Sequence, residues 1–336
     1  MNESSDPRAR GAREWAHSQW SVRNPKWATA STDASFRRYF RLQSGAESRI
    51  VMDAPPAQED CRPFVRIARL LAAWGLNVPQ VLAEDYEQGF LLLSDLGTQT
   101  VLDVLTPDNA DAQLGLAMDA LIRLQSMAMA RPSEWSFLPA YDADLLWREL
   151  RLFQDWYLPR HLGIDLSKDD RRELELAQEP LVRSALAQPR TFVHRDYMPR
   201  NLMVGAPGPG ILDFQDAVAG PISYDPVCLF RDAFHSWPVE RVEGWLRQYW
   251  QQGRAAGLPL PDDLAKFRKQ ADWMGLQRHL KVLGIFARLS YRDGKAKYVA
   301  DTPRFVRYVM DVAPHHPELR ALSGFFERHV LPRVPL

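Results

Sequence analysis

Residues 36–42, with the sequence FRRYFRL, alternate in a way that predicts a β-strand. Arg37, Tyr39 and Arg41 would lie on one face of that strand, with Arg38 and the apolar even-numbered positions on the other. Further strands are predicted over residues 48–53, 79–83 and 90–93, and a helix over 58–74. Ahead of them we expect a polar tail over residues 1–10, and then an amphipathic helix around Ala12, Trp15, Ala16 and Trp20.

After Ser94-Asp95-Leu96-Gly97 the pattern becomes mainly helical. The change predicts a domain boundary there, with an N-terminal domain of residues 1–96 and a C-terminal domain of residues 97–336. A short strand at 191–193 and a hairpin through Gly205–Gly210 interrupt the helices. The helices are expected at 108–130, 142–158, 168–187, 223–235, 238–256, 262–290, 302–312 and 316–331.

Composition excludes several classes of protein. Lys plus Arg equals Asp plus Glu, 42 of each in 336 residues, so we expect no nucleic-acid partner and no membrane partner. Cys61 and Cys228 match no metal or disulfide spacing and are interpreted as reduced core residues. The N-terminal segment lacks the apolar core of a signal peptide, and no run reaches the ~18 apolar residues of a membrane span. We therefore expect a cytoplasmic protein.

Residues 191–217, TFVHRDYMPRNLMVGAPGPGILDFQDA, contain the main chemical signal of the chain. His194-Arg195-Asp196 is followed five residues later by Asn201, and a D-F-x element begins at Asp213. This order is the H-R-D-x-x-x-x-N and D-F-x arrangement of kinases. A buried His with acids in ordinary turns is the alternative, but it does not explain why all the parts occur in order. The stretch predicts a kinase active site.

Each part of this stretch has a predicted role in phosphoryl transfer. Asp196 is the predicted general base or hydroxyl-orienting residue, and Asn201 and Asp213 are the predicted ligands of Mg²⁺, with Mn²⁺ as an alternative. His194 and Arg195 are expected to brace the loop. The predicted ATP contacts are Ser35, Arg37 and Arg38 near the first strand, and Ser94 and Leu96 at the domain boundary.

The strand at residues 48–53 lacks a Lys, although kinases place a phosphate-binding Lys on their third strand. Asp53 would repel phosphate if it faced the nucleotide. Either Arg37 or Arg38 replaces the Lys, or metal and backbone amides hold the phosphates. The missing Lys also leaves open a pseudokinase that binds ligand without turnover.

The pattern D-x-x-D-x-x-x-G-P-x-x-x-D from Asp213 to Asp225, with no long activation segment, resembles the aminoglycoside phosphotransferase family. The resemblance covers nearly the whole chain and implies an α+β, protein-kinase-like, two-lobed fold. The N-terminal lobe would be small and β-rich, and the C-terminal lobe large and mainly helical. It also implies that Asp225 braces the catalytic loop through hydrogen bonds.

Within that family, segments such as STDASFRRYFRL, FLLLSDLG and ILDFQDAVAGPISYDPVCLFRD are similar to the bacterial anomeric amino-sugar kinases. The similarity implies ATP-dependent phosphorylation of N-acetylmuramate and N-acetylglucosamine at C1, which serves peptidoglycan recycling. Aminoglycoside, choline and homoserine kinases of the same family are the alternatives. We expect a monomer.

Three residues after the catalytic stretch are candidates for contacts with the sugar. Arg231 and Asp232 follow the Asp225 turn, and Arg278 lies on a later helix. A buried Arg would suit the lactyl carboxylate of N-acetylmuramate, because it can donate two parallel hydrogen bonds. A surface salt bridge is an equally good interpretation of Arg231 and Asp232, and a solvated side chain is the alternative for Arg278.

Overall fold

The structure, a computed structural model, describes residues 6–22, 25–31 and 36–334. The chain forms two compact units, and each is described here by itself. Unit 1 contains residues 1–124 and 199–216, and unit 2 contains residues 125–198 and 217–336. Residues 97–124 and 199–216, which the predicted boundary after residue 96 assigned to the C-terminal domain, group with the N-terminal strands in unit 1.

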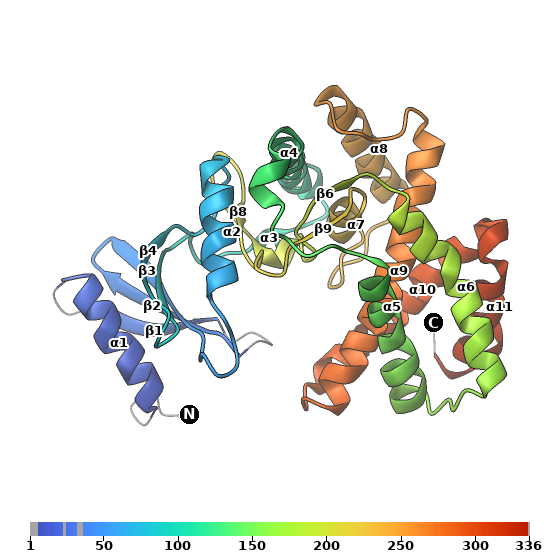
Figure 1. Cartoon of the computed structure of the whole chain (residues 1–336), viewed down its shortest axis with the longest axis horizontal. Helices are drawn as coiled ribbons and strands as arrows, with labels where there is room; N and C mark the ends of the chain where they lie inside the picture. The colour runs from blue at the N-terminus through green and yellow to red at the C-terminus, as the bar shows by residue number, and fades with distance from the viewer. Residues whose placement is uncertain (1–5, 23–24, 32–35, 335–336) are drawn as a thin grey trace. The chain divides into compact units, whose positions relative to one another are not determined.

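Unit 1 is built on a five-stranded antiparallel sheet with the strand order β1-β2-β3-β5-β4 (Figure 1). The alternation read from residues 36–42 is confirmed, because Phe40 and Leu42 are buried against α1 while Tyr39 and Arg41 lie on the other face. The strands are β1 (Lys26–Ser31), β2 (Arg38–Ser44), β3 (Glu47–Asp53), β4 (Val81–Asp85) and β5 (Phe90–Ser94).

Helix α1 (Pro7–Gln19) covers one face of this sheet and buries Ala9, Ala12 and Ala16 there (Figure 1). The expectation of a polar tail over residues 1–10 is therefore wrong for residues 7–10, while residues 1–5 lie outside the described part. Asp6 caps the helix by accepting hydrogen bonds from the backbone N–H groups of Arg8 and Ala9, and Pro7 occupies the first turn. This start signal is local and readable from the sequence.

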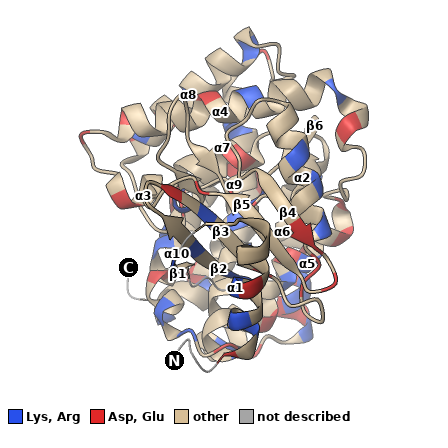
Figure 2. Cartoon of the chain, turned by 90° about the vertical axis from the view of Figure 1, so that its left-hand side faces the viewer, with Lys and Arg blue, Asp and Glu red and all other residues tan. Residues whose placement is uncertain are grey.

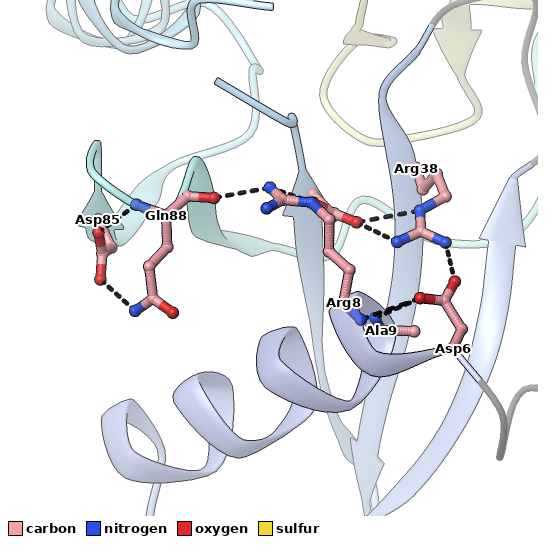
Figure 3. A network of polar contacts seen from close by, with 7 residues as sticks. Asp6, Arg8, Ala9, Arg38, Asp85 and Gln88 are labelled. Atoms are coloured by element: carbon pink, nitrogen blue, oxygen red, sulfur yellow. Dashed lines mark hydrogen bonds and ion pairs between the residues drawn. The ribbon is translucent and has the colours of Figure 1, made fainter. Parts of the chain in front are cut away.

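A polar network ties α1 to the sheet (Figure 3). Arg38 of β2 donates to Asp6 and also to Asp53 of β3, with 3.0 Å between its Nε and the Asp53 carboxylate. Arg8 lies 2.7 Å from the other Asp53 oxygen and donates to the backbone oxygen of Gln88 at 2.6 Å. Asp53 is fully buried, and a buried charge is unfavourable unless it is paired. Arg8 and Arg38 provide this pairing on the α1 side of the sheet.

The remaining elements of unit 1 follow the expected pattern in part, because α2 begins at Arg62 instead of residue 58 and the short helix α3 was not expected. The hairpin expected through Gly205–Gly210 is present, because β7 (Leu202–Met203) and β8 (Gly210–Ile211) pair antiparallel. The helices are α2 (Arg62–Ala73), α3 (Val101–Val104) and α4 (Ala110–Ala130), whose last residues belong to unit 2.

Unit 2 is mainly helical, and α9 (Leu264–Tyr291) runs through its core with α5, α6, α7 and α10 around it (Figure 1). Its two strands, β6 (Arg190–Val193) and β9 (Val218–Pro221), pair antiparallel. The other helices are α5 (Ala143–Leu152), continued by a π-helical segment (Phe153–His161), α6 (Lys168–Leu186), α7 (Tyr224–Phe230), α8 (Val239–Ala255), α10 (Thr302–Val312) and α11 (Arg320–Phe325).

Two helices expected in this unit are shorter than the pattern suggested. The helix expected over 223–235 ends at Phe230, and that expected over 316–331 is divided into a 3₁₀ turn, α11 and a π-helical turn at Phe326–Val330. In both places apolar residues continue at near-helical spacing beyond the end of the regular helix, so periodicity alone did not reveal these ends.

Charge and hydropathy agree with the composition. Lys and Arg are interspersed with Asp and Glu along the elements visible in Figure 2. Among the described residues, no helix combines the length and apolarity that crossing a membrane would require. Cys61 and Cys228 are buried and free, as expected.

Candidate active site

Strand β6 leads directly into the predicted catalytic loop. His194 is fully buried, with its ring edge-on to Tyr197 at 5.6 Å between centroids, whereas the Asp196 side chain is half-buried. The backbone N–H of Asp196 donates to Nδ1 of His194 at 3.3 Å. The buried imidazole thus helps to shape the loop that carries the carboxylate.

Asp225, in the first turn of α7, binds the backbone of the same loop through its side chain. One of its carboxylate oxygens accepts from the backbone N–H of His194 at 2.7 Å, and the other from that of Arg195 at 3.0 Å. Burial raises the pKa of Asp225 to about 7, although these two backbone donors oppose the shift. Both contacts go to the main chain, so they fix the path of the loop itself.

In unit 1 the predicted metal ligands Asn201 and Asp213 lie side by side, with 3.5 Å between the Asn201 amide nitrogen and the Asp213 carboxylate. The backbone of Leu212 donates to the Asn201 carbonyl at 2.9 Å, and Gln215 donates to Asp213 at 2.8 Å. Asp213 has a left-handed backbone, with φ at 62°, and Phe214 after it is buried against Phe64. The hairpin and this aromatic contact hold Asp213 in that conformation.

The two side chains fit a Mg²⁺ ion. Both offer oxygen donors, which this hard cation prefers, and two protein ligands leave positions for phosphate oxygens and water. The metal assignment itself stays a prediction.

Beside this pair, unit 1 contains a cavity of about 320 Å³. Apolar side chains form part of it, and the backbone from Ser94 to Thr98 passes along it. Its mixture of apolar surface, backbone groups and the Asn201–Asp213 pair suits a nucleotide. The lining includes Ser31, Tyr39, Arg41, Ile50, Leu93, Ser94, Asp95, Leu96, Gly97, Arg200, Asn201, Met203, Leu212 and Asp213.

The predicted nucleotide contacts divide between the two faces of the sheet. Ser94 and Leu96 line the cavity, and Arg37 lies 3.5 Å from the Asp213 carboxylate. Arg38 is paired with Asp6 and Asp53 on the α1 face. Asp53 also faces α1 and does not line the cavity. Ser35 lies outside the described residues.

Sequence reasoning missed Arg41, which lines the cavity on the same strand face as Tyr39. Its Nε lies 2.6 Å from Asp95, and its Nη2 donates to the Gly97 carbonyl at 2.6 Å. Burial alone would raise the pKa of Asp95, but hydrogen bonds from Arg41 and Ser48 lower it. Arg41 therefore fixes the segment after β5, and the alternation of residues 36–42 already placed it on the Arg37 face.

The different environments of Arg37 and Arg38 predict different effects when each is replaced by alanine. Arg37→Ala should raise the KM for ATP about tenfold, because a charge-assisted contact is worth ~1.5–3 kcal/mol. Arg38→Ala should leave this KM unchanged and lower the free energy of unfolding by about 1–3 kcal/mol, because it removes a partner of buried Asp53. Steady-state kinetics and urea unfolding of both variants check this.

Each variant is the control for the other. If neither changes the KM for ATP, the phosphates depend on metal and backbone amides instead of Arg37.

The predicted sugar contacts Arg231, Asp232 and Arg278 lie near one another in unit 2. Arg231 pairs with Asp272 at 2.5 Å, and Arg278 donates to the Arg231 carbonyl at 3.4 Å. Asp232 is fully buried, which raises its pKa to about 6, and Arg278 is 2% exposed. None of the three is a solvated surface residue, and their role in sugar binding stays a prediction.

Comparison with known proteins identifies the family. Residues 26–267 match the model of the phosphotransferase enzyme family. The chain is 57% identical over 294 residues to the N-acetylmuramate/N-acetylglucosamine kinase of Pseudomonas aeruginosa, covering 88% of this chain and 86% of that protein. It is 42% identical over 312 residues to the kinase of the same name from Neisseria meningitidis, covering 92% of each.

Solved structures agree on the fold. The GDP complex of aminoglycoside 2'-phosphotransferase-IIIa matches with a TM-score of 0.63 at 15% identity, covering 94% of this chain and 100% of that one. A choline kinase from Streptococcus pneumoniae matches with a TM-score of 0.56 at 13% identity, covering 91% and 99%. These matches confirm the α+β, protein-kinase-like fold class. The chain belongs to the phosphotransferase enzyme family, and it is a phosphotransferase.

Proposed function

We propose that the protein uses ATP and Mg²⁺ to phosphorylate the anomeric C1 hydroxyl of N-acetylmuramate and N-acetylglucosamine. The observation that carries this proposal is the 57% identity, over 88% of the chain, to a kinase named for these two sugars. The products would be sugar 1-phosphates for peptidoglycan recycling. We further propose that the protein works in the cytoplasm as a monomer.

Asp196 is the proposed base. Its carboxylate accepts the proton of the C1 hydroxyl while the bond between that oxygen and the γ-phosphorus forms and the bond from this phosphorus to ADP breaks. The C1 hydroxyl belongs to a hemiacetal, and the ring oxygen makes it more acidic than the other sugar alcohols. The main contribution of Asp196 is therefore to orient the C1 hydroxyl, and a strong base is not required.

Asn201 and Asp213 are the proposed metal ligands, and Mg²⁺ bound to them would neutralise charge on the phosphate oxygens. Arg37, 3.5 Å from Asp213, is the proposed cation for the phosphates in place of the missing strand lysine. The cavity along Ser94 to Thr98 is the proposed site of the adenine base.

Several alternatives remain within the same fold. Aminoglycoside, choline and homoserine kinases are other enzymes of this kind, and a pseudokinase would bind ligand without turnover. The two solved neighbours described above, an aminoglycoside phosphotransferase and a choline kinase, are 15% and 13% identical to this chain, so they support the fold and not the substrate. The high identity to the amino-sugar kinases favours the sugar.

The position of phosphorylation gives a direct test. We expect ATP consumption with N-acetylmuramate, N-acetylglucosamine and 6-deoxy-N-acetylglucosamine, and none with the methyl glycoside of N-acetylglucosamine, whose C1 oxygen is blocked. Product mass and acid lability identify the ester, because a sugar 1-phosphate is non-reducing and labile in acid.

The outcomes separate the alternatives. Phosphorylation of the glycoside but not of the 6-deoxy sugar would indicate a 6-kinase. Turnover only with kanamycin, choline or homoserine would identify another acceptor, and nucleotide binding without turnover on any acceptor would indicate a pseudokinase.

A further inference from the structure

One buried carboxylate in unit 2 collects donors from three separate parts of the chain. Glu149 of α5 is 4% exposed, and its Oε1 lies 2.6 Å from Nη2 of Arg195 and 2.9 Å from Nζ of Lys281. Its Oε2 accepts from the Gln277 amide at 3.1 Å and from the Tyr141 hydroxyl. Arg195 belongs to the catalytic loop, whereas Gln277 and Lys281 are one turn apart on α9.

Stability alone is a weak reason to bury so many charged groups together. Moving charges out of water costs several kcal/mol per ion, and well-packed apolar residues often replace a buried ion pair without loss. Burial alone would raise the pKa of Glu149, but the positive charges of Lys281 and Arg195 lower it to about 2. The carboxylate is therefore ionised at neutral pH and holds the Arg195 guanidinium by a charge-assisted contact.

Arg195 needs this support because its backbone is strained. Its φ is 75°, a left-handed conformation that costs a non-glycine residue roughly 1–3 kcal/mol and persists only when its surroundings impose it. Asp225 holds the backbone N–H groups of His194 and Arg195, while Glu149 holds the Arg195 side chain. The loop is thus fixed at its main chain and at its side chain.

The two anchors are themselves connected. Nζ of Lys281 donates to the Tyr224 hydroxyl at 3.0 Å, and Tyr224 immediately precedes Asp225. These contacts form a continuous network of hydrogen bonds and ion pairs. It connects the Arg195 side chain through Glu149 and Lys281 to Tyr224, and the neighbouring Asp225 binds the loop backbone. Because Asp196 directly follows Arg195, this network also sets the orientation of the Asp196 backbone and side chain.

We propose that Glu149 is a positioning residue for the reaction: by fixing Arg195 it presents Asp196 to the acceptor hydroxyl. The inference rests on the proposed function for the role of Asp196. In kinases that are switched by modification, an added phosphate paired with arginines orders the activation segment. Here a built-in carboxylate supplies the negative charge, so the loop is ordered without modification.

The test uses Glu149→Gln, which keeps the side-chain volume and an acceptor oxygen, together with Arg195→Gln and the double variant. Each single change should lower kcat about 100-fold, with the KM for ATP within about twofold of wild type, because a displaced catalytic group costs about this much. The double variant should also lose about 100-fold, since both changes break the same contact. Exposed Glu175→Gln on α6 is the matched control and should match wild type.

A second variant guards against misfolding, because Glu149→Gln leaves Arg195 and Lys281 as excess buried charge. Glu149→Gln/Lys281→Met removes one charge of each sign and should fold as wild type does while showing the same loss of kcat. In the unliganded protein, this variant and Glu149→Gln, which keeps the contact between Lys281 and Tyr224, should both exchange the backbone amides of His194 and Arg195 at least about tenfold faster, with global unfolding of the double variant unchanged.

Hydrogen exchange needs no substrate, so it judges Glu149 even if the wild type phosphorylates neither amino sugar and the proposed function fails. Unchanged exchange in the loop would overturn the inference. Losses of kcat that multiply in the Glu149→Gln/Arg195→Gln variant would also overturn it, because independent sites would then be acting.

Discussion

Replacing Asp196 by Asn is expected to lower kcat by about 10²–10⁴-fold while leaving the affinity for ATP nearly unchanged. The amide keeps the size of the side chain but cannot take the proton of the acceptor hydroxyl. Asp196 is half-buried, and its backbone is held by His194 within a loop anchored at Asp225, so the substitution should not disturb folding. Single-turnover kinetics and equilibrium nucleotide binding measure the two effects separately.

The control is Asp169→Asn, an exposed acid on α6, which should behave as wild type. If Asp196→Asn keeps more than about a tenth of the activity, a loss below ~1.4 kcal/mol, the assignment of Asp196 as the base is wrong.

Replacing Asp213 by Asn is expected to lower turnover by about 100-fold or more through weakened metal binding. Asn retains an oxygen donor and tolerates the left-handed backbone that Asp213 adopts, so the main consequence is one negative charge fewer beside the divalent ion. A divalent ion held by Asp213 would stabilise transition-state charge by several kcal/mol, and each ~1.4 kcal/mol lost is tenfold in rate. Mn²⁺ titrations followed by electron paramagnetic resonance, with ADP present, should show weaker binding.

Nucleotide affinity measured without a divalent ion separates this effect from loss of the nucleotide cavity, and should stay close to wild type. Asp119→Asn, an exposed change on α4 of the same unit, is the matched control. Unchanged Mn²⁺ affinity in Asp213→Asn would remove this residue from the metal site.

The alternation of apolar and polar residues predicted secondary structure well wherever one face of an element packs against the core. Four strands of the unit 1 sheet, β2 to β5, were placed within a few residues, because a strand with one apolar face can pair in one register only. Strand β1 (Lys26–Ser31) was missed, because its side chains are mostly exposed and show no apolar alternation. The start of α1 was missed although Asp6-Pro7 is a readable cap, because the polar composition of residues 1–10 was given more weight. The division of residues 316–331 depends on packing in unit 2, which no local pattern encodes.

The sequence by itself predicted the chemistry of the loop. His194, Arg195, Asp196, Asn201 and Asp213 follow one another in an order that few other functions would need. The prediction was possible because these residues are close in the chain, so their spacing carries information.

Only the tertiary structure decided how the charged side chains of the candidate site pair with one another. It separated Arg37 from Arg38, since Arg37, just before β2, lies beside Asp213, whereas Arg38 pairs with Asp6 and Asp53 on the sheet face that α1 covers. It paired Arg41 with Asp95, 54 residues later, and Arg195 with Glu149, 46 residues earlier. Burial of a charge depends on side chains brought together from distant parts of the chain, and no spacing in the sequence records that meeting.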